Sequence, residues 1–491
     1  MRYKRGFLLK RFFLTTSSGI LCSRLAGFIR DLLSASVLGS GLYSDIFFVA
    51  FKFPNLFRRI FAEGAFSQSF LPAFISSRYK GAFAAGILGF FSLLLLVLVL
   101  LVDHFRFFCT KLLAYGFSPH TVELAKDIVA INFYYLLLVF WATFLSTLLQ
   151  YKNHFWVSAY HTVLLNLAMI IALYFHRDQH TLEIVHTLSY AVLCGGIAQV
   201  ALHFYPLYHL GFFKLFCVGV YTLFKRPLNP KQMRRQKIIK QERAHFFKQF
   251  IPGVLGNSAS QISAFIDTFL ASFLATGSIS YLYYANRIFQ LPLALFAIAI
   301  STALFPTIAK AIKEGNTHLA MQHMQQAFTF LTYMLLACTL GGIMLAKPIL
   351  SLLFERGHFN SIDVMHSAAV FRAYLIGLLP FGLAKIFSLW LYSHKEQIKA
   401  AKIALYSLVF GTTCSLLLMP YLQASALALS SSLAGFLLCG LQIRAFGFKR
   451  FLGMIIFKDV LYLVLLLALE ALVLALFLWA LKSFKIWHLL I

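Results

Sequence analysis

Long apolar runs alternate with short polar connections along almost the whole chain. Thirteen of these runs reach about 20 residues, the length that a helix needs to cross a bilayer, whereas barrel strands would alternate over about 10 residues. The pattern therefore predicts an all-α polytopic membrane protein with about 13 transmembrane helices. The predicted spans are residues 12–38, 45–75, 82–102, 127–150, 155–175, 187–209, 247–275, 280–311, 326–347, 366–393, 398–420, 423–445 and 457–481.

Composition and charge agree with this class of protein. Of the 491 residues, 60% are hydrophobic and 12% are charged, about half of the charged share that is usual in soluble proteins. The net charge of +27 would suggest nucleic-acid binding in a soluble protein. Here the Lys and Arg residues concentrate in every second loop, so the positive-inside rule places the N-terminus in the cytoplasm. We therefore expect no nucleic-acid partner.

A faint internal repeat divides the predicted spans into two halves. The motif of Gly39-Ser40, Tyr43 and Pro54 recurs 238 residues later as Gly277-Ser278, Tyr281 and Pro292. The offset aligns the first six spans with the next six, which predicts two parallel six-helix lobes, and the matched prolines predict a bend in each. The expected divisions are an N-terminal lobe at 1–211, a basic cytoplasmic linker at 212–246, a C-terminal lobe at 247–445, and an additional transmembrane helix and tail at 446–491. Two-lobed membrane proteins of this kind are typically alternating-access transporters.

The linker region is strongly basic. Residues 225–248 contain nine Lys or Arg residues and one acid. We expect this segment to form a cytoplasmic helix that lies on anionic lipids. The alternative is a direct role in gathering an anionic substrate.

Ionisable residues inside the predicted membrane segments concentrate in the first, second and eighth spans. They are Arg24, Arg30 and Asp31 in the first span, Lys52, Arg58, Arg59 and Glu63 in the second with Asp45 at its outer end, and Arg287 in the eighth. Each such charge costs about 2.5–3.5 kcal/mol at the centre of a membrane helix. These helices must therefore face one another, a wet cavity, or both.

Helix geometry pairs only some of these charges. Arg59 and Glu63 are four residues apart and share a helix face, and so do Arg24 and Asp31, which are seven apart. Arg30 adjoins Asp31 in the sequence, but neighbouring helical residues point about 100° apart. We therefore expect Arg30 to have no local acid.

The same holds for Arg58 and Arg287, which have no acid three or four residues away in their own helices. The surplus of charge is thus cationic, and arginine is the residue suited to bidentate capture of a phosphate. The alternative is that these arginines snorkel to the interface or tie helices together.

Motifs of enzymatic chemistry are absent from the sequence. No Gly is followed by Lys, which excludes a phosphate-binding loop and a built-in ATPase. The histidines show no metal-ligand spacing, and the segments between spans are too short for a catalytic domain. A transporter is therefore favoured over a lipid-linked glycosyltransferase, and a scaffold would not need unpaired arginines in the membrane.

Three stretches carry a family resemblance: SRLAGFIRD (23–31), SDIFFVAFKFPNLFRRIFAEGAFSQSFLP (44–72) and SYLYYANRIFQLP (280–292). They resemble the MurJ, or MviN, lipid II flippase family of the multidrug/oligosaccharidyl-lipid/polysaccharide exporter superfamily. The resemblance implies a non-enzymatic transporter of the bacterial inner membrane. It would move lipid II, the undecaprenyl-diphosphate-linked disaccharide-pentapeptide of peptidoglycan, from the inner to the outer leaflet by alternating access. The alternatives are an exporter of another lipid-linked oligosaccharide and a multidrug exporter, although an arginine-rich cavity disfavours cationic drugs.

The resemblance also implies roles for individual residues. The substrate-binding residues would be Arg24, Arg30, Arg58 and Arg287, and the gating or arginine-positioning residues would be Asp31, Asp45, Arg59, Glu63 and Asn286. Family members often have Asp at the position of Asn286, and they usually have two spans after the second lobe where this chain shows one.

Expectations about cofactors and partners follow from the same resemblance. Asp267 matches an acid linked to sodium in some members, but the eleventh span holds no acid, so Asp267 is a weak sodium candidate and no other metal site is expected. We expect no cofactor, and a dependence on membrane potential or a monovalent cation stays open. Lipid II, anionic lipids and cell-wall synthesis proteins are the expected partners.

Overall fold

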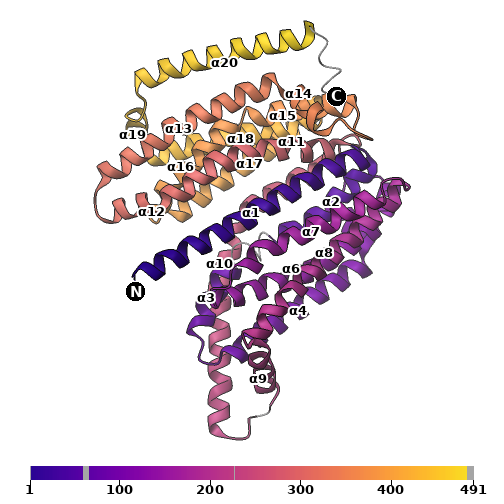
Figure 1. Cartoon of the computed structure of the whole chain (residues 1–491), viewed down its shortest axis with the longest axis vertical. Helices are drawn as coiled ribbons and strands as arrows, with labels where there is room; N and C mark the ends of the chain where they lie inside the picture. The colour runs from indigo at the N-terminus through magenta and orange to yellow at the C-terminus, as the bar shows by residue number, and fades with distance from the viewer. Residues whose placement is uncertain (1, 59–65, 226, 484–491) are drawn as a thin grey trace. The chain divides into compact units, whose positions relative to one another are not determined.

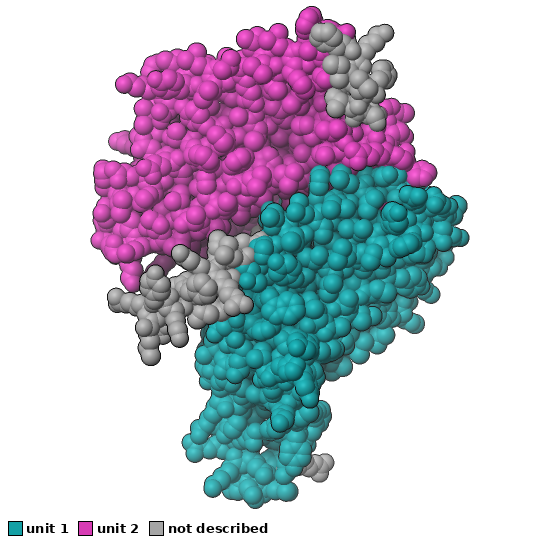
Figure 2. All heavy atoms as spheres, viewed as in Figure 1, with its two compact units in different colours: residues 1–37, 42–265 teal, residues 38–41, 266–491 magenta. Residues whose placement is uncertain are grey.

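The computed structural model describes residues 2–58, 66–225 and 227–483, and over these ranges it contains helices and no strands. Two compact units divide the chain (Figure 2): unit 1 comprises residues 1–37 and 42–265, and unit 2 comprises residues 38–41 and 266–491. The all-α prediction is confirmed. A bilayer leaves no water for free backbone groups, so a membrane segment must satisfy its hydrogen bonds internally, as a helix does.

The helices of unit 1 form one bundle with a long hairpin at its end (Figure 1). They are α1 (Arg2–Leu38), α2 (Leu42–Phe57), α3 (Phe66–Ser76), α4 (Lys80–His104), α5 (Arg106–Leu113), α6 (Pro119–Tyr151), α7 (Trp156–Phe175), α8 (Thr181–His209), α9 (Phe212–Phe224) and α10 (Pro230–Ala271), whose last residues, 266–271, belong to unit 2. Helix α6 lies at the centre, in contact with α2, α4, α5 and α8, and α7 packs along α8.

Phenylalanine rings fill much of the core of unit 1. Phe66 of α3 is fully buried and stacks on Phe70 with ring centroids 5.2 Å apart. It also meets Phe140 of α6 at 5.5 Å and Phe246 of α10 at 6.0 Å. Aromatic pairs at such distances add stabilisation beyond burial, which joins α3, α6 and α10 into one core.

Unit 2 is a second helical bundle. It contains α11 (Ser278–Pro292), the π-helix η2 (Leu293–Ile298), α12 (Ala299–Lys313), α13 (Thr317–Met344), α14 (Ala346–Phe354), α15 (Ser361–Leu375), α16 (Leu378–Ser393), α17 (Gln397–Leu422), α18 (Ala424–Phe446), α19 (Phe448–Leu452) and α20 (Phe457–Ser483). Helix α18 packs against α15, α16 and α17, whereas α20 contacts α13 and lies along the outside of the unit (Figure 1).

Ten helical segments of the described residues are long and apolar enough to cross a membrane. They include α4, α6, α7 and α8 of unit 1, and the segments Ser278–Lys313 and Ser361–Ser393 of unit 2. The predicted spans 12–38 and 247–275 also lie on helices, α1 and α10. The predicted span 45–75 is divided into α2 and α3 around undescribed residues. The number of 13 spans and the orientation of the N-terminus stay predictions.

The two glycines of the internal repeat share one backbone conformation. Gly39 has φ 65° just before α2, and Gly277 has φ 93° just before α11. Both angles lie in the left-handed region that glycine adopts without strain. The matched prolines differ, because Pro54 lies inside α2 while Pro292 ends α11 where the π-helix begins. Pro292 lacks the N–H that a regular helix would use there, which accounts for the irregularity.

The basic segment predicted to be a linker is largely helical and belongs to unit 1. Helices α9 and the first part of α10 form its hairpin (Figure 1). Its single acid, Glu242, accepts hydrogen bonds from the Ser77 hydroxyl at 2.8 Å and from the backbone N–H of Arg78 at 2.9 Å. Arg235 lies over the Tyr79 ring at 4.7 Å from the ring centroid. These contacts hold α10 to the turn between α3 and α4.

Glycine allows α9 to approach α4 closely. A Cβ atom built on Gly219 of α9 would collide with the carbonyl group of Gly81 at the start of α4. Lipid tails are as apolar as helix side chains, so burial alone does not drive helices together in a membrane. Helices associate there through close van der Waals packing, which small residues such as glycine permit. The contact of Gly81 with Gly219 therefore sets how closely the hairpin packs.

We expect Gly219→Ala to destabilise the protein by about 1–3 kcal/mol, because the added methyl group meets backbone rather than a side chain that can move. The measurement is the thermal unfolding midpoint of the purified protein in detergent. Gly89→Ala is the matched control, since Gly89 lies in α4 and a Cβ atom added there would have nothing within 4 Å. An unfolding midpoint of Gly219→Ala equal to that of the control would contradict the packing argument.

Candidate substrate-binding site

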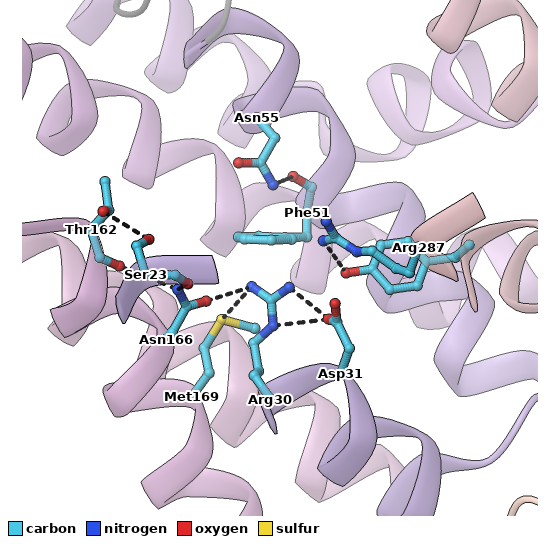
Figure 3. A network of polar contacts seen from close by, with 10 residues as sticks. Ser23, Arg30, Asp31, Phe51, Asn55, Thr162, Asn166, Met169 and Arg287 are labelled. Carbon is cyan, nitrogen blue, oxygen red and sulfur yellow. Dashed lines mark hydrogen bonds and ion pairs between the residues drawn. The ribbon is translucent and has the colours of Figure 1, made fainter. Parts of the chain in front are cut away.

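Arg30 is the most deeply enclosed of the four arginines expected to bind substrate. It lies on α1 in unit 1, and 5% of it is exposed (Figure 3). Its Nη2 and Nε atoms donate to Oδ1 of Asp31 at 2.7 and 3.2 Å. Its Nη1 atom donates to Oδ1 of Asn166 on α7 at 3.0 Å. The Phe51 ring of α2 covers the guanidinium at 5.8 Å.

The expectation that Arg30 would have no local acid is wrong. Asp31 is 2% exposed and its carboxylate pairs with Arg30, although the two Cα–Cβ bonds point about 100° apart. The physical reason is the length of the arginine side chain, which reaches around the helix to present two nitrogens to one oxygen. A buried ion pair of this kind persists only where further hydrogen bonds satisfy its polar atoms, and Asn166 supplies one.

The other unit 1 residues of the candidate site vary in burial. Arg24 is exposed on α1, and Arg58 is half-buried immediately after α2. Asp45 is 3% exposed in the first turn of α2, where the positive end of the helix dipole favours a carboxylate. The predicted pair of Arg59 and Glu63 lies outside the described residues.

Arg287 lies on α11 in unit 2. Its Nη2 atom donates to the Tyr283 hydroxyl at 2.7 Å, and the guanidinium lies 4.8 Å from the centroid of the same ring. The two contacts combine a hydrogen bond with a cation–π interaction, so one aromatic residue orients this arginine. The neighbouring Asn286 accepts a hydrogen bond from Gln290 one turn later on α11.

Asp267 lies in unit 2 near the end of α10 and is half-buried. Tyr374 of α15 stacks on Phe289 of α11, with ring centroids 5.4 Å apart. Over the described ranges, no group of three or more His, Cys, Asp or Glu side chains is arranged to hold a metal ion. The role of Asp267 as a sodium ligand stays a prediction.

Ionisable residues inside other predicted spans, Lys385 and Glu470 among them, were missing from the sequence-based set. Lys385 is exposed on α16, where most neighbouring side chains are buried. Glu470 lies midway along α20, and its Oε1 atom is 3.0 Å from the position of a Cβ built on Gly341 of α13. The description of charges in three spans was therefore incomplete, and a full scan of each apolar run for ionisable residues would have found both.

Asn166 and Tyr283 were also missed, for a different reason. Neither carries a charge at neutral pH, so a search for unpaired charges does not select them. The signal that could have found Asn166 is an amide within the apolar run LLNLAMII of α7, because polar side chains in membrane helices commonly bond across helix interfaces. Tyr283 gives no such signal among the many aromatic residues.

Comparisons with known proteins place this arrangement of helices in a family. The family model described as "Lipid II flippase MurJ" matches residues 34–490. A probable lipid II flippase MurJ of Helicobacter pylori is 57% identical over 423 residues, which cover 86% of this chain and 92% of the relative.

Solved structures show the same fold. A lipid II flippase MurJ in an inward closed conformation has a TM-score of 0.73 at 24% identity, covering 97% of this chain and 100% of that chain. An outward-facing multidrug resistance MATE family transporter of the MOP superfamily has a TM-score of 0.55 at 15% identity, covering 91% and 96%. The family match spans nearly the whole sequence, and the likeness to a membrane transporter extends over the same length. This chain therefore belongs to the MurJ lipid II flippase family, a family of bacterial inner-membrane transporters that are not enzymes.

Proposed function

We propose that this protein moves lipid II from the inner to the outer leaflet of the cytoplasmic membrane by alternating access. The observation that carries the proposal is the match of the lipid II flippase family model to residues 34–490. Support for the mechanism comes from the fold, which solved transporters adopt in inward closed and outward-facing conformations. In such transporters, helical halves move as bodies while the substrate site is exposed to one side at a time.

The arginines supply the chemistry that a lipid-linked diphosphate requires. Moving the diphosphate across the bilayer removes its hydration, and guanidinium groups can replace the lost hydrogen bonds with charge-assisted ones. In the proposal Arg30, Arg58 and Arg287 bind the diphosphate, and Arg24 extends the cationic surface. Asp31, Asp45, Arg59, Glu63 and Asn286 position the arginines or act in gating.

Another lipid-linked oligosaccharide would present the same diphosphate to these arginines, so its transport is the nearest competing function. The identity of the substrate must therefore be tested on the lipid itself. A multidrug exporter for cations is disfavoured, because such a substrate would need carboxylates in excess of basic residues. A dependence on membrane potential or a monovalent cation stays a prediction, as does an association with cell-wall synthesis proteins.

Arg30→Ala, Arg58→Ala and Arg287→Ala are each expected to fail to restore growth and lipid II transport in a cell depleted of its own flippase. The reason is that each substitution removes a phosphate ligand. The measurement is the fraction of lipid II accessible in the outer leaflet after depletion, with the wild-type chain restoring it. Arg106→Ala is the matched control, since Arg106 pairs with Asp127 on an exposed surface of unit 1. Membrane levels of each variant are measured by immunoblotting.

A normal outer-leaflet fraction with all three variants would refute the phosphate role of these arginines. An outer-leaflet fraction that fails to recover with the wild-type chain would refute the assignment of lipid II as substrate. Arg30→Lys retains the charge but loses the planar fork, so we expect it to restore transport only in part.

We further propose that the α9–α10 hairpin of unit 1 binds anionic lipids. Basic side chains on the first part of α10 are exposed, namely Lys231, Arg234, Lys237 and Lys240. Large apolar residues of the same hairpin are exposed as well: Phe213, Tyr221, Phe224 and Leu228. Basic and apolar groups exposed on one hairpin match a membrane interface, where each basic side chain contributes about 1 kcal/mol of attraction to anionic lipid.

Replacing those four basic residues with Gln is expected to weaken binding of a soluble phosphatidylglycerol to the purified protein, because four positive charges leave the hairpin. Native mass spectrometry or a thermal-shift titration measures the effect, with phosphatidylcholine as the neutral lipid. The control replaces Lys310, Lys313, Lys395 and Lys399 of unit 2, which removes the same charge elsewhere. Equal losses in both variants would show general electrostatics and contradict a site on the hairpin.

A further inference from the structure

Asn166 makes three hydrogen bonds at the interface of α1 and α7 (Figure 3). It is 8% exposed, and its Oδ1 atom accepts from Nη1 of Arg30 at 3.0 Å. Its Nδ2 atom donates to the backbone carbonyl of Ser23 at 3.3 Å and to that of Thr162 at 3.4 Å. The reverse orientation of the amide would place N–H groups against the guanidinium and the oxygen against two carbonyls. Only the orientation described here satisfies all three partners.

The helices on both sides of this amide are held to each other independently. The Thr162 hydroxyl donates to the Ser23 hydroxyl at 2.9 Å, one turn before Asn166 on α7. Further along, the Ser18 and Tyr160 hydroxyls lie 2.8 Å apart. The amide lies beside Gly27 of α1, where an added Cβ would be in ordinary van der Waals contact with it at 3.7 Å. The position of Asn166 is thus fixed by backbone groups and not only by Arg30.

Asn166 and Asp31 bind different nitrogens of Arg30. Asp31 accepts from Nε and Nη2, so these two bonds hold only one edge of the guanidinium. The bond from Nη1 to Asn166 adds a second anchor on another helix, which fixes the plane of the group against α7. A fork-shaped cation binds a phosphate well only when its plane is held in the productive orientation.

We propose that Asn166 is a positioning residue, which orients Arg30 for the diphosphate of the transported lipid. The proposal rests on the proposed function of Arg30 as a phosphate ligand. Asn166 contributes no charge of its own, and its effect on binding passes through Arg30. It also couples the orientation of this arginine to the packing of α1 on α7, since the same amide bonds both.

A double-mutant cycle tests whether the effect passes through Arg30. The full chain is purified in detergent with Asn166→Ala, Arg30→Ala and both substitutions, and the Kd for lipid II is measured. We expect Asn166→Ala to weaken binding by roughly tenfold, in the range of coupling found within one hydrogen-bond network. The double variant should bind as weakly as Arg30→Ala and no more weakly, because the arginine is then already absent.

Asn132→Ala is the matched control. Asn132 is a fully buried amide of α6 that donates to the backbone of Ile128 and to the Ser189 hydroxyl, each at 2.9 Å. We expect its Kd for lipid II to equal that of the wild type, although its unfolding midpoint falls. Equal losses of binding with Asn132→Ala and Asn166→Ala would show a purely structural role and overturn the proposal.

Asn166→Asp keeps the proposal testable if the alanine variant fails to fold. The carboxylate preserves the size of the side chain and the acceptor for Arg30. It also places a second negative charge beside the guanidinium, in addition to Asp31, so binding of lipid II should weaken. Unchanged binding by Asn166→Asp, or losses that multiply in the double-mutant cycle, would overturn the positioning role. Normal lipid II binding by Arg30→Ala would refute the phosphate role of Arg30 itself. Impaired binding by Arg30→Ala together with normal binding by Asn166→Ala would refute only the inference about Asn166.

Discussion

The need to satisfy a charge away from water governs the interior of unit 1. Arg30 and Asp31 are both almost completely buried, and each would be costly without the other. Their ion pair compensates the charge, but a guanidinium has more N–H groups than one carboxylate can accept. Asn166 accepts one of them from a neighbouring helix, so the chemistry of a single arginine requires α1 and α7 to lie side by side. The packing of these helices and the position of a candidate ligand therefore depend on the same hydrogen bonds.

Elsewhere in the unit 1 bundle, close glycine contacts and aromatic packing join the helices. Gly81 and Gly219 bring α4 and α9 together at backbone distance, and the rings around Phe66 join α3, α6 and α10. Neither type of contact requires a polar group to lose its solvent. Glu242 supplies the polar fastening at the end of the bundle, where backbone N–H and hydroxyl donors are available at a helix start.

The sequence predicted the helical class and most span positions because a bilayer permits few alternatives to long apolar helices. It did not predict the partner of Arg30, since the direction of a Cα–Cβ bond says little about where a side chain with four rotatable bonds ends. Asn166 was missed because an amide carries no charge and its value depends on a helix 136 positions away in the chain. The break that separates α15 from α16 was also missed. It falls at Gly377, where a Cβ would meet the backbone of Ser432 at 2.7 Å, a tertiary contact that no local pattern reveals.

The pairing of Arg30 bears on how a flippase can release what it binds. On the proposed function, a phosphate that takes Arg30 as a ligand does so beside the carboxylate of Asp31, so part of the attraction is offset from the start. An isolated arginine in a medium of low dielectric constant would hold a diphosphate far more strongly, and tight binding equal on both sides of the membrane would slow release. A transporter needs a substrate site that is selective for phosphate but does not bind it so tightly that release becomes slow. An arginine already held by a carboxylate and an amide meets both requirements, because its geometry remains specific while its net charge toward the ligand is reduced.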